Sequence, residues 1–85
     1  MRREDDQTYR LRLTVRNQPG VLVRCAMVFG RRGHTIEALQ CTPVADSESA
    51  THMDITAYGQ PGVIRQIMAQ LRKSVDILDV VEREA

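Results

Sequence analysis

The residues with the clearest chemical potential lie in the turn Asn17-Gln18-Pro19-Gly20, which separates two apolar segments. Pro19 fixes one backbone angle, and Gly20 accepts backbone conformations closed to other residues and has no Cβ to block an approaching ligand. If a helix starts here, the backbone N–H groups of Gly20, Val21 and Leu22 are free to hold an anion. The turn is therefore a candidate carboxylate site.

The side chain of Asn17 extends this chemistry, because its amide is both a donor and an acceptor. An ammonium group held there, beside a carboxylate on the helix start, would make the turn a site for a free amino acid. An ordinary helix start, with Asn17 as a plain turn residue, explains the same spacing. The turn by itself leaves both interpretations open.

Groups for catalysis or metal binding are scattered along the chain. His34, His52 and Asp54 have no second histidine or carboxylate at ligand spacing, so we expect a non-catalytic protein without a metal site. The loop Arg16-Asn17-Gln18-Pro19-Gly20 contains no cysteine, which excludes binding of a soft metal ion there. Cys25 and Cys41 lie in apolar stretches without CxxC spacing, so we expect two buried free thiols rather than a disulfide or a zinc site.

Composition argues against nucleic acid and membranes as partners. The chain has 85 residues, with 12 basic and 11 acidic side chains and a net charge of +1. Tyr9 and Tyr58 lie at the ends of two apolar alternating segments, at positions where RNA-binding domains with a βαββαβ fold carry stacking aromatics. No RNP1 pattern surrounds them. No apolar run approaches the roughly 18 residues of a membrane span. With no signal-peptide pattern at the N-terminus, we expect a cytoplasmic protein.

Apolar periodicity predicts six elements behind a flexible tail at residues 1–8. Alternation predicts strands, and spacing of three and four residues predicts helices. The predicted order is strand 9–15, helix 21–32, strand 35–44, strand 51–58, helix 61–71 and strand 75–81. The alternation slips at Ala38-Leu39, which indicates a bulge.

This order predicts a single domain over residues 9–85 with an α+β, ferredoxin-like βαββαβ fold. Its four-stranded antiparallel sheet would carry both helices on one face. Right-handed crossovers place the first and third strands in the centre.

The two edge strands differ in charge. Asp76 and Asp79 on the last strand hinder its edge from pairing with another chain, whereas Glu37 is the only charged residue of the second strand. A long, lightly charged edge aggregates unless something pairs with it. A domain this small also gains from a partner subunit. We therefore predict a homodimer joined along the second strand.

The sequence resembles the ACT domains of the acetolactate (acetohydroxyacid) synthase small subunits, in their short form. The resemblance begins with Leu13-Thr14-Val15-Arg16-Asn17-Gln18-Pro19-Gly20-Val21-Leu22. It continues through Phe29-Gly30-Arg31-Arg32-Gly33-His34-Thr35-Ile36-Glu37 and Val75-Asp76-Ile77-Leu78-Asp79-Val80. It covers residues 9–81, and Asn-x-Pro-Gly before a helix recurs across ACT domains.

The resemblance implies a regulatory subunit that binds valine between two ACT domains. Such a subunit activates a catalytic subunit and makes it sensitive to feedback inhibition in branched-chain amino-acid biosynthesis. The thiamine diphosphate, FAD and magnesium of that enzyme are expected on the catalytic subunit, with no cofactor on this chain. One half of the implied site is lined by Asn17, Gly20, Val21 and Leu22, and the other half by Thr35 and Ile36 of the neighbouring protomer.

The chain departs from the family pattern in two places. Thr35 stands where the family usually has Asn, which removes one side-chain amide from the ligand. Many small subunits have a second C-terminal domain, and we expect this chain to resemble the short form without it. The alternatives are therefore a free-standing ACT protein that senses another amino acid, and an interaction module that senses none.

Overall fold

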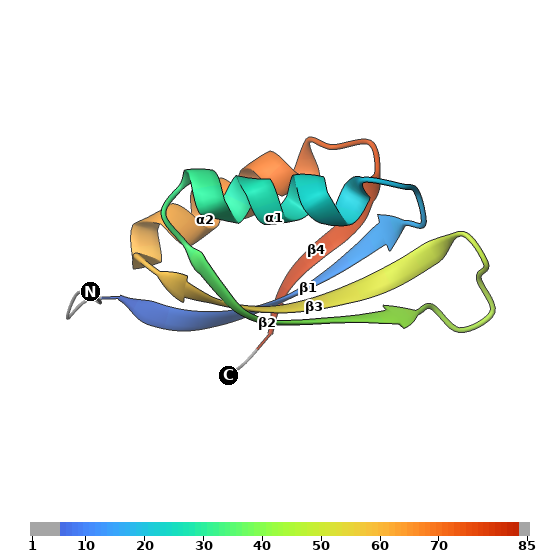
Figure 1. The fold of residues 1–85 in the computed structure, drawn as a ribbon, viewed down its shortest axis with the longest axis horizontal. Helices are drawn as coiled ribbons and strands as arrows, with labels where there is room; N and C mark the ends of the chain where they lie inside the picture. Colours follow the sequence, from blue (N-terminus) through green and yellow to red (C-terminus); the bar gives the residue numbers. More distant parts are fainter. Residues whose placement is uncertain (1–5, 84–85) are drawn as a thin grey trace.

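The computed structural model describes residues 6–83. Its elements follow the order β1 (Gln7–Arg16), α1 (Val21–Arg31), β2 (Thr35–Pro43), β3 (Ala50–Gly59), α2 (Pro61–Arg72) and β4 (Ile77–Arg83). The strands form one antiparallel sheet in the order β2-β3-β1-β4. Both helices lie on the same face of that sheet (Figure 1). The predicted ferredoxin-like fold, with the first and third strands in the centre, is confirmed.

The predicted boundaries are shifted at both ends of the chain. β1 begins at Gln7, which pairs with Gly59, so residues 7 and 8 belong to the sheet and not to a tail. β4 begins at Ile77 because Asp76 lies in the preceding turn, where its carbonyl accepts the Arg16 N–H at 2.8 Å. Residues 1–5 of the predicted tail and residues 84–85 of the predicted domain lie outside the described residues.

The predicted bulge in β2 is present one residue before the expected position. Ile36 pairs with Ala57 and Ala38 with Thr56, so Glu37 is the additional residue. A bulge of this kind bends a strand and increases its twist.

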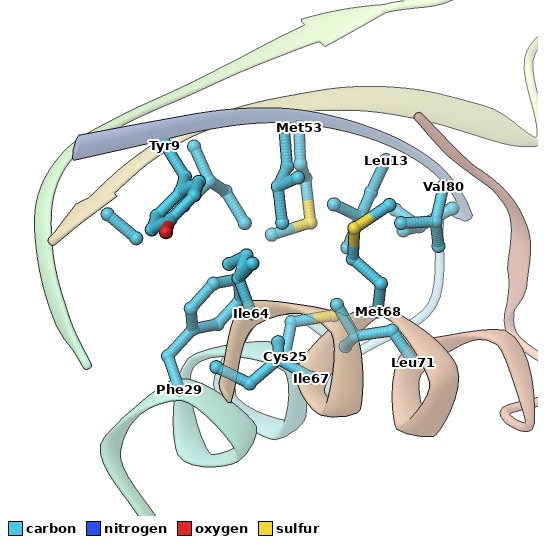
Figure 2. Packing of buried hydrophobic residues seen from close by; sticks show 14 of the residues in the cluster. Tyr9, Leu13, Cys25, Phe29, Met53, Ile64, Ile67, Met68, Leu71 and Val80 are labelled. Atoms are coloured by element: carbon cyan, nitrogen blue, oxygen red, sulfur yellow. The ribbon is translucent and has the colours of Figure 1, made fainter. Parts of the chain in front are cut away.

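The core lies between the helices and the covered face of the sheet (Figure 2). Alternate residues of β1 and β3 meet buried residues of the helices, among them Leu11, Leu13, Met53, Ile55, Cys25, Phe29, Ile67 and Leu71. Each fully buried side chain of this size stabilises the fold by about 1.5–3 kcal/mol. On α1 the buried positions are Val21, Cys25 and Phe29. Leu22, the residue after Val21 in α1, is 44% exposed.

β2 is the least covered strand, and no residue in it is fully buried. Cys41 is exposed, so the prediction of two buried thiols holds only for Cys25. The β2–β3 hairpin extends beyond the N-terminal end of α1, which leaves this part of β2 without a helix above it (Figure 1). Among the residues described, neither helix is long and apolar enough to cross a bilayer.

Candidate functional site

Backbone hydrogen bonds hold the turn between β1 and α1. The Asn17 N–H donates to the Ser49 carbonyl at 2.8 Å, and the Gln18 N–H donates to the Arg16 carbonyl at 2.8 Å. Gly20 has φ 85° and ψ −9°, a left-handed conformation that glycine adopts without strain. The turn is thus tied to the loop before β3, and Gly20 sets the direction in which α1 leaves it.

The N-terminal end of α1 has a positive electrostatic character that nothing on the helix offsets. Gly20 caps the helix without a side-chain hydrogen bond, and the first turn contains no acidic residue. The macrodipole therefore favours an anion here. One of the three N–H groups predicted to be free is engaged, because the Val21 N–H donates to the Gln18 carbonyl at 3.4 Å. That bond is longer than an ordinary N–H···O bond, so a ligand carboxylate would compete with it easily.

A groove of about 420 Å³ opens between this turn and the β2–β3 hairpin. The turn and α1 supply Asn17, Gln18, Val21 and Leu22, and the sheet supplies Val15, Arg16, Cys41, Pro43, Thr51 and Met53. Amide groups thus lie at one side of the groove and mostly apolar side chains at the other. This combination suits a small molecule that has a polar head and an apolar side chain.

The structure brings together part of the predicted site. Asn17, Val21 and Leu22 line the groove, and Gly20 lies in the same turn without lining it. Thr35 and Ile36 are elsewhere, at the start of β2. Thr35 pairs with Tyr58, whereas Val15 beside the turn pairs with Thr51, so seven residues of β3 separate the two places. At about 3.4 Å per residue the separation is about 24 Å, too far for one chain to enclose a small ligand with both.

Sequence reasoning missed the contribution of the hairpin to this groove. Cys41, Pro43 and Met53 line it. Alternation in residues 51–58 places Met53 on the same face as Ile55, but the pairing of Cys41 with Met53 depends on the register of β2 and β3. The polar loop at residues 45–49 was the available signal, because the length of a hairpin loop fixes the register of its strands.

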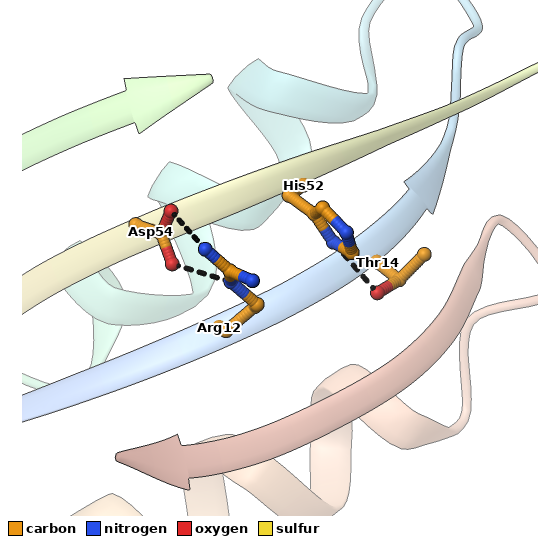
Figure 3. A network of polar contacts seen from close by, with 4 residues as sticks. All are labelled: Arg12, Thr14, His52 and Asp54. Carbon is orange, nitrogen blue, oxygen red and sulfur yellow. Dashed lines mark hydrogen bonds and ion pairs between the residues drawn. The ribbon is translucent and has the colours of Figure 1, made fainter. Parts of the chain in front are cut away.

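Polar side chains on the open face of the sheet pair with one another (Figure 3). The Arg12 guanidinium donates to both carboxylate oxygens of Asp54, at 2.8 and 3.1 Å. These hydrogen bonds hold the pKa of Asp54 below its usual value. His52 Nδ1 lies 3.2 Å from the Thr14 hydroxyl. His52 and Asp54 share the open face of the sheet, but each forms its hydrogen bonds across to β1, to Thr14 and Arg12.

His34 is buried at the opposite end of the sheet from the turn, and its side chain is 5% exposed. Neither ring nitrogen has a partner in hydrogen-bond geometry among the described residues. Burial lowers the pKa of His34, and the nearby backbone of Arg32 opposes the shift only in part. The ring lies against Gly59 and near Tyr9, whose ring centroid is 6.3 Å away. Tyr9 faces the helices, so the aromatic platform that RNA-binding sheets carry on the open face is not formed here.

Comparison with known proteins identifies the family. The family described as the AHAS small subunit-like ACT domain, where AHAS is acetohydroxyacid synthase, matches residues 11–79. The acetolactate synthase small subunit of Mycobacterium leprae (strain TN) is 35% identical over 78 residues, which are 92% of this chain and 46% of that protein. That of Buchnera aphidicola subsp. Baizongia pistaciae is 36% identical over 74 residues, 87% of this chain and 46% of that protein. The chain thus spans about half the length of the curated relatives it matches.

Solved structures agree with the sequence comparison. The acetolactate synthase small subunit of Thermotoga maritima superposes with a TM-score of 0.75 at 26% identity, over 89% of this chain and 47% of that one. The ACT domain of a GTP pyrophosphokinase from Chlorobium tepidum has a TM-score of 0.74 at 12% identity, over 95% of this chain and 90% of that one. At that identity the likeness concerns the fold alone. The chain belongs to the acetohydroxyacid synthase small subunit-like family of ACT domains.

Proposed function

We propose that this chain is a non-catalytic regulatory subunit of acetolactate synthase, which senses valine and activates the catalytic subunit in the cytoplasm. The observation that carries the proposal is the groove beside Asn17, Val21 and Leu22, in a chain of this family. Thiamine diphosphate, FAD and magnesium would belong to the catalytic subunit and not to this chain.

The groove supports an amino acid as the ligand. A ligand carboxylate would lie at the start of α1, where the first turn of the helix has no acidic side chain to compete for the N–H groups. The ammonium group would be held by the side-chain oxygen of Asn17. An aliphatic side chain would contact the apolar wall that Val21 and Met53 provide. A feedback ligand of this size would bind with a Kd between roughly 1 µM and 1 mM, within the affinity a few heavy atoms can supply.

A homodimer along β2 would complete the site. Within residues 6–83 nothing pairs with the outer side of this nine-residue edge strand, and Glu37 is its only charged residue. α1, the helix that packs against β2, carries exposed Leu22, Val23 and Met27. A second copy would cover the strand edge and these side chains together. It would also bring Thr35 and Ile36 to the groove of its neighbour, which a single chain does not do.

Regulation would follow from linkage. Valine would bind one arrangement of the dimer better than another and shift the attached catalytic subunit toward its inhibited state. Coupling of this kind typically changes affinity by about 5- to 150-fold. Thr35 supplies a hydroxyl where the family usually has an amide, so leucine and isoleucine belong in the same titration as valine.

Calorimetric titration of the dimer with the three amino acids tests the proposal. We expect valine to bind, and Gly20→Asp to weaken binding at least about tenfold, because a carboxylate there repels the carboxylate of the ligand. Gly20→Asn is the matched control, since both side chains tolerate φ 85° similarly and no atom lies within 4 Å of the new Cβ. Absence of heat from all three amino acids would contradict valine sensing and leave the two alternatives, a sensor of another amino acid and a non-sensing module. Equal affinities of the Asp and Asn variants would place the ligand elsewhere.

A further inference from the structure

The helices leave one face of the sheet open (Figure 1). This face carries a second groove, of about 330 Å³. It lies across all four strands and is lined by Arg10, Arg12, Gln40, Asp54, Thr56 and Arg83. The candidate amino-acid groove is on the helix-covered side of the same strands, where Val15 and Met53 point. The two grooves are therefore separate surfaces.

The charges in this second groove do not balance. Arg12 and Asp54 neutralise each other through their two hydrogen bonds (Figure 3). Arg10 and Arg83 are directly opposite each other in the β1–β4 ladder, and both are exposed. Among residues 6–83 no carboxylate lies within ion-pair distance of either guanidinium. The groove therefore has an excess of two positive charges.

Two like charges directly opposite each other destabilise an antiparallel pair of strands. An acidic residue at either position would serve the fold better. A bound carboxylate would remove the repulsion, since guanidinium groups hold carboxylates through two parallel hydrogen bonds. The uncharged Gln40 and Thr56 offer further hydrogen bonds at the same surface. The arrangement thus has the character of a binding surface for a negatively charged partner.

We propose that this groove docks an acidic segment of the catalytic subunit, with carboxylates of that segment bridging Arg10 and Arg83. The inference rests on the proposed function and adds the surface through which the two subunits meet. A second copy of this chain does not fit, because it would present the same positive excess. Single-stranded RNA is less favoured, because stacking aromatics usually accompany basic groups in such sites and Tyr9 lies on the other face.

Arg10→Glu tests the proposal without weakening the fold, because the new carboxylate would face Arg83 across the strands. The probe is the acetolactate synthase catalytic subunit of the source organism, titrated at low and high salt. We expect Arg10→Glu to raise the Kd at least about tenfold, with an unchanged or higher Tm and unchanged valine binding. Arg83→Glu should do the same, and the wild-type Kd should rise with salt. Arg65 is an exposed residue of α2, so Arg65→Glu is the control for net charge and should leave the Kd unchanged.

Four results would overturn the inference. Wild-type affinity in both Arg10→Glu and Arg83→Glu would place docking elsewhere while leaving the proposed function intact. An equal loss in Arg65→Glu would mean that only net charge matters. A changed oligomer size in Arg10→Glu, or tight Arg10-dependent binding of a mixed-sequence RNA oligonucleotide, would assign the groove to another partner. If the wild-type chain does not bind the catalytic subunit at all, the proposed function fails and this inference fails with it.

Discussion

The contact between His34 and Gly59 provides a sharp test of the packing at the start of β2. A Cβ added to Gly59 would lie 2.6 Å from three atoms of the imidazole, whereas real Cβ contacts are essentially never closer than 3.0 Å. The ring has little room to withdraw, because it is 5% exposed. Gly59→Ala should therefore destabilise the fold by about 1–3 kcal/mol, as overpacking does. For a domain of this size each kcal/mol lowers the Tm by about 4–8 °C.

A double-mutant cycle with His34→Ala isolates this steric effect. With the ring removed, Gly59→Ala should become neutral or stabilising, because alanine loses less conformational freedom than glycine by about 0.5–1 kcal/mol. Urea unfolding followed by circular dichroism, at one protein concentration, measures all four proteins. Gly62→Ala is the control, since nothing lies within 4 Å of its Cβ. An equal loss of stability from Gly59→Ala in both backgrounds would refute the reasoning.

Two further predictions concern buried groups. Burial lowers the pKa of His34 below 6.5, so as the pH falls His34 is protonated in the unfolded chain before it is protonated in the folded chain. Stability should therefore fall as pH drops below 6.5, and His34→Leu should reduce the loss of stability between pH 7 and pH 5, measured by urea unfolding at the two pH values. Burial also raises the pKa of Cys25 to about 11. Ellman's reagent at pH 8 should label exposed Cys41 quickly and Cys25 only after unfolding; two fast thiols would contradict the packing.

Local patterns predicted most of the fold. Strict alternation in residues 9–15 and 51–58 identified the two central strands, and the turn residues before each helix identified the helix starts. The start of β4 was misplaced because Val75 is β-branched like a strand residue but lies 84% exposed in the turn. Its exposure depends on where α2 ends relative to the sheet, which local propensity does not specify.

The site was predictable where one segment of chain builds it. Asn17, Val21 and Leu22 follow from the turn, whereas Cys41 and Met53 require the register of the β2–β3 hairpin. The exposure of Cys41 follows from how far α1 extends over β2, a tertiary property. The roles of Thr35 and Ile36 stay predictions, because they depend on a second chain.

The most direct test of the central claim is the rate of acetolactate formation by the catalytic subunit, measured with and without this chain and valine. We predict that a stoichiometric amount of this chain raises the rate, and that valine then lowers it in a manner that requires this chain. Gly20→Asp should still raise the rate but make it insensitive to valine. A rate that this chain leaves unchanged, with or without valine, would contradict the account.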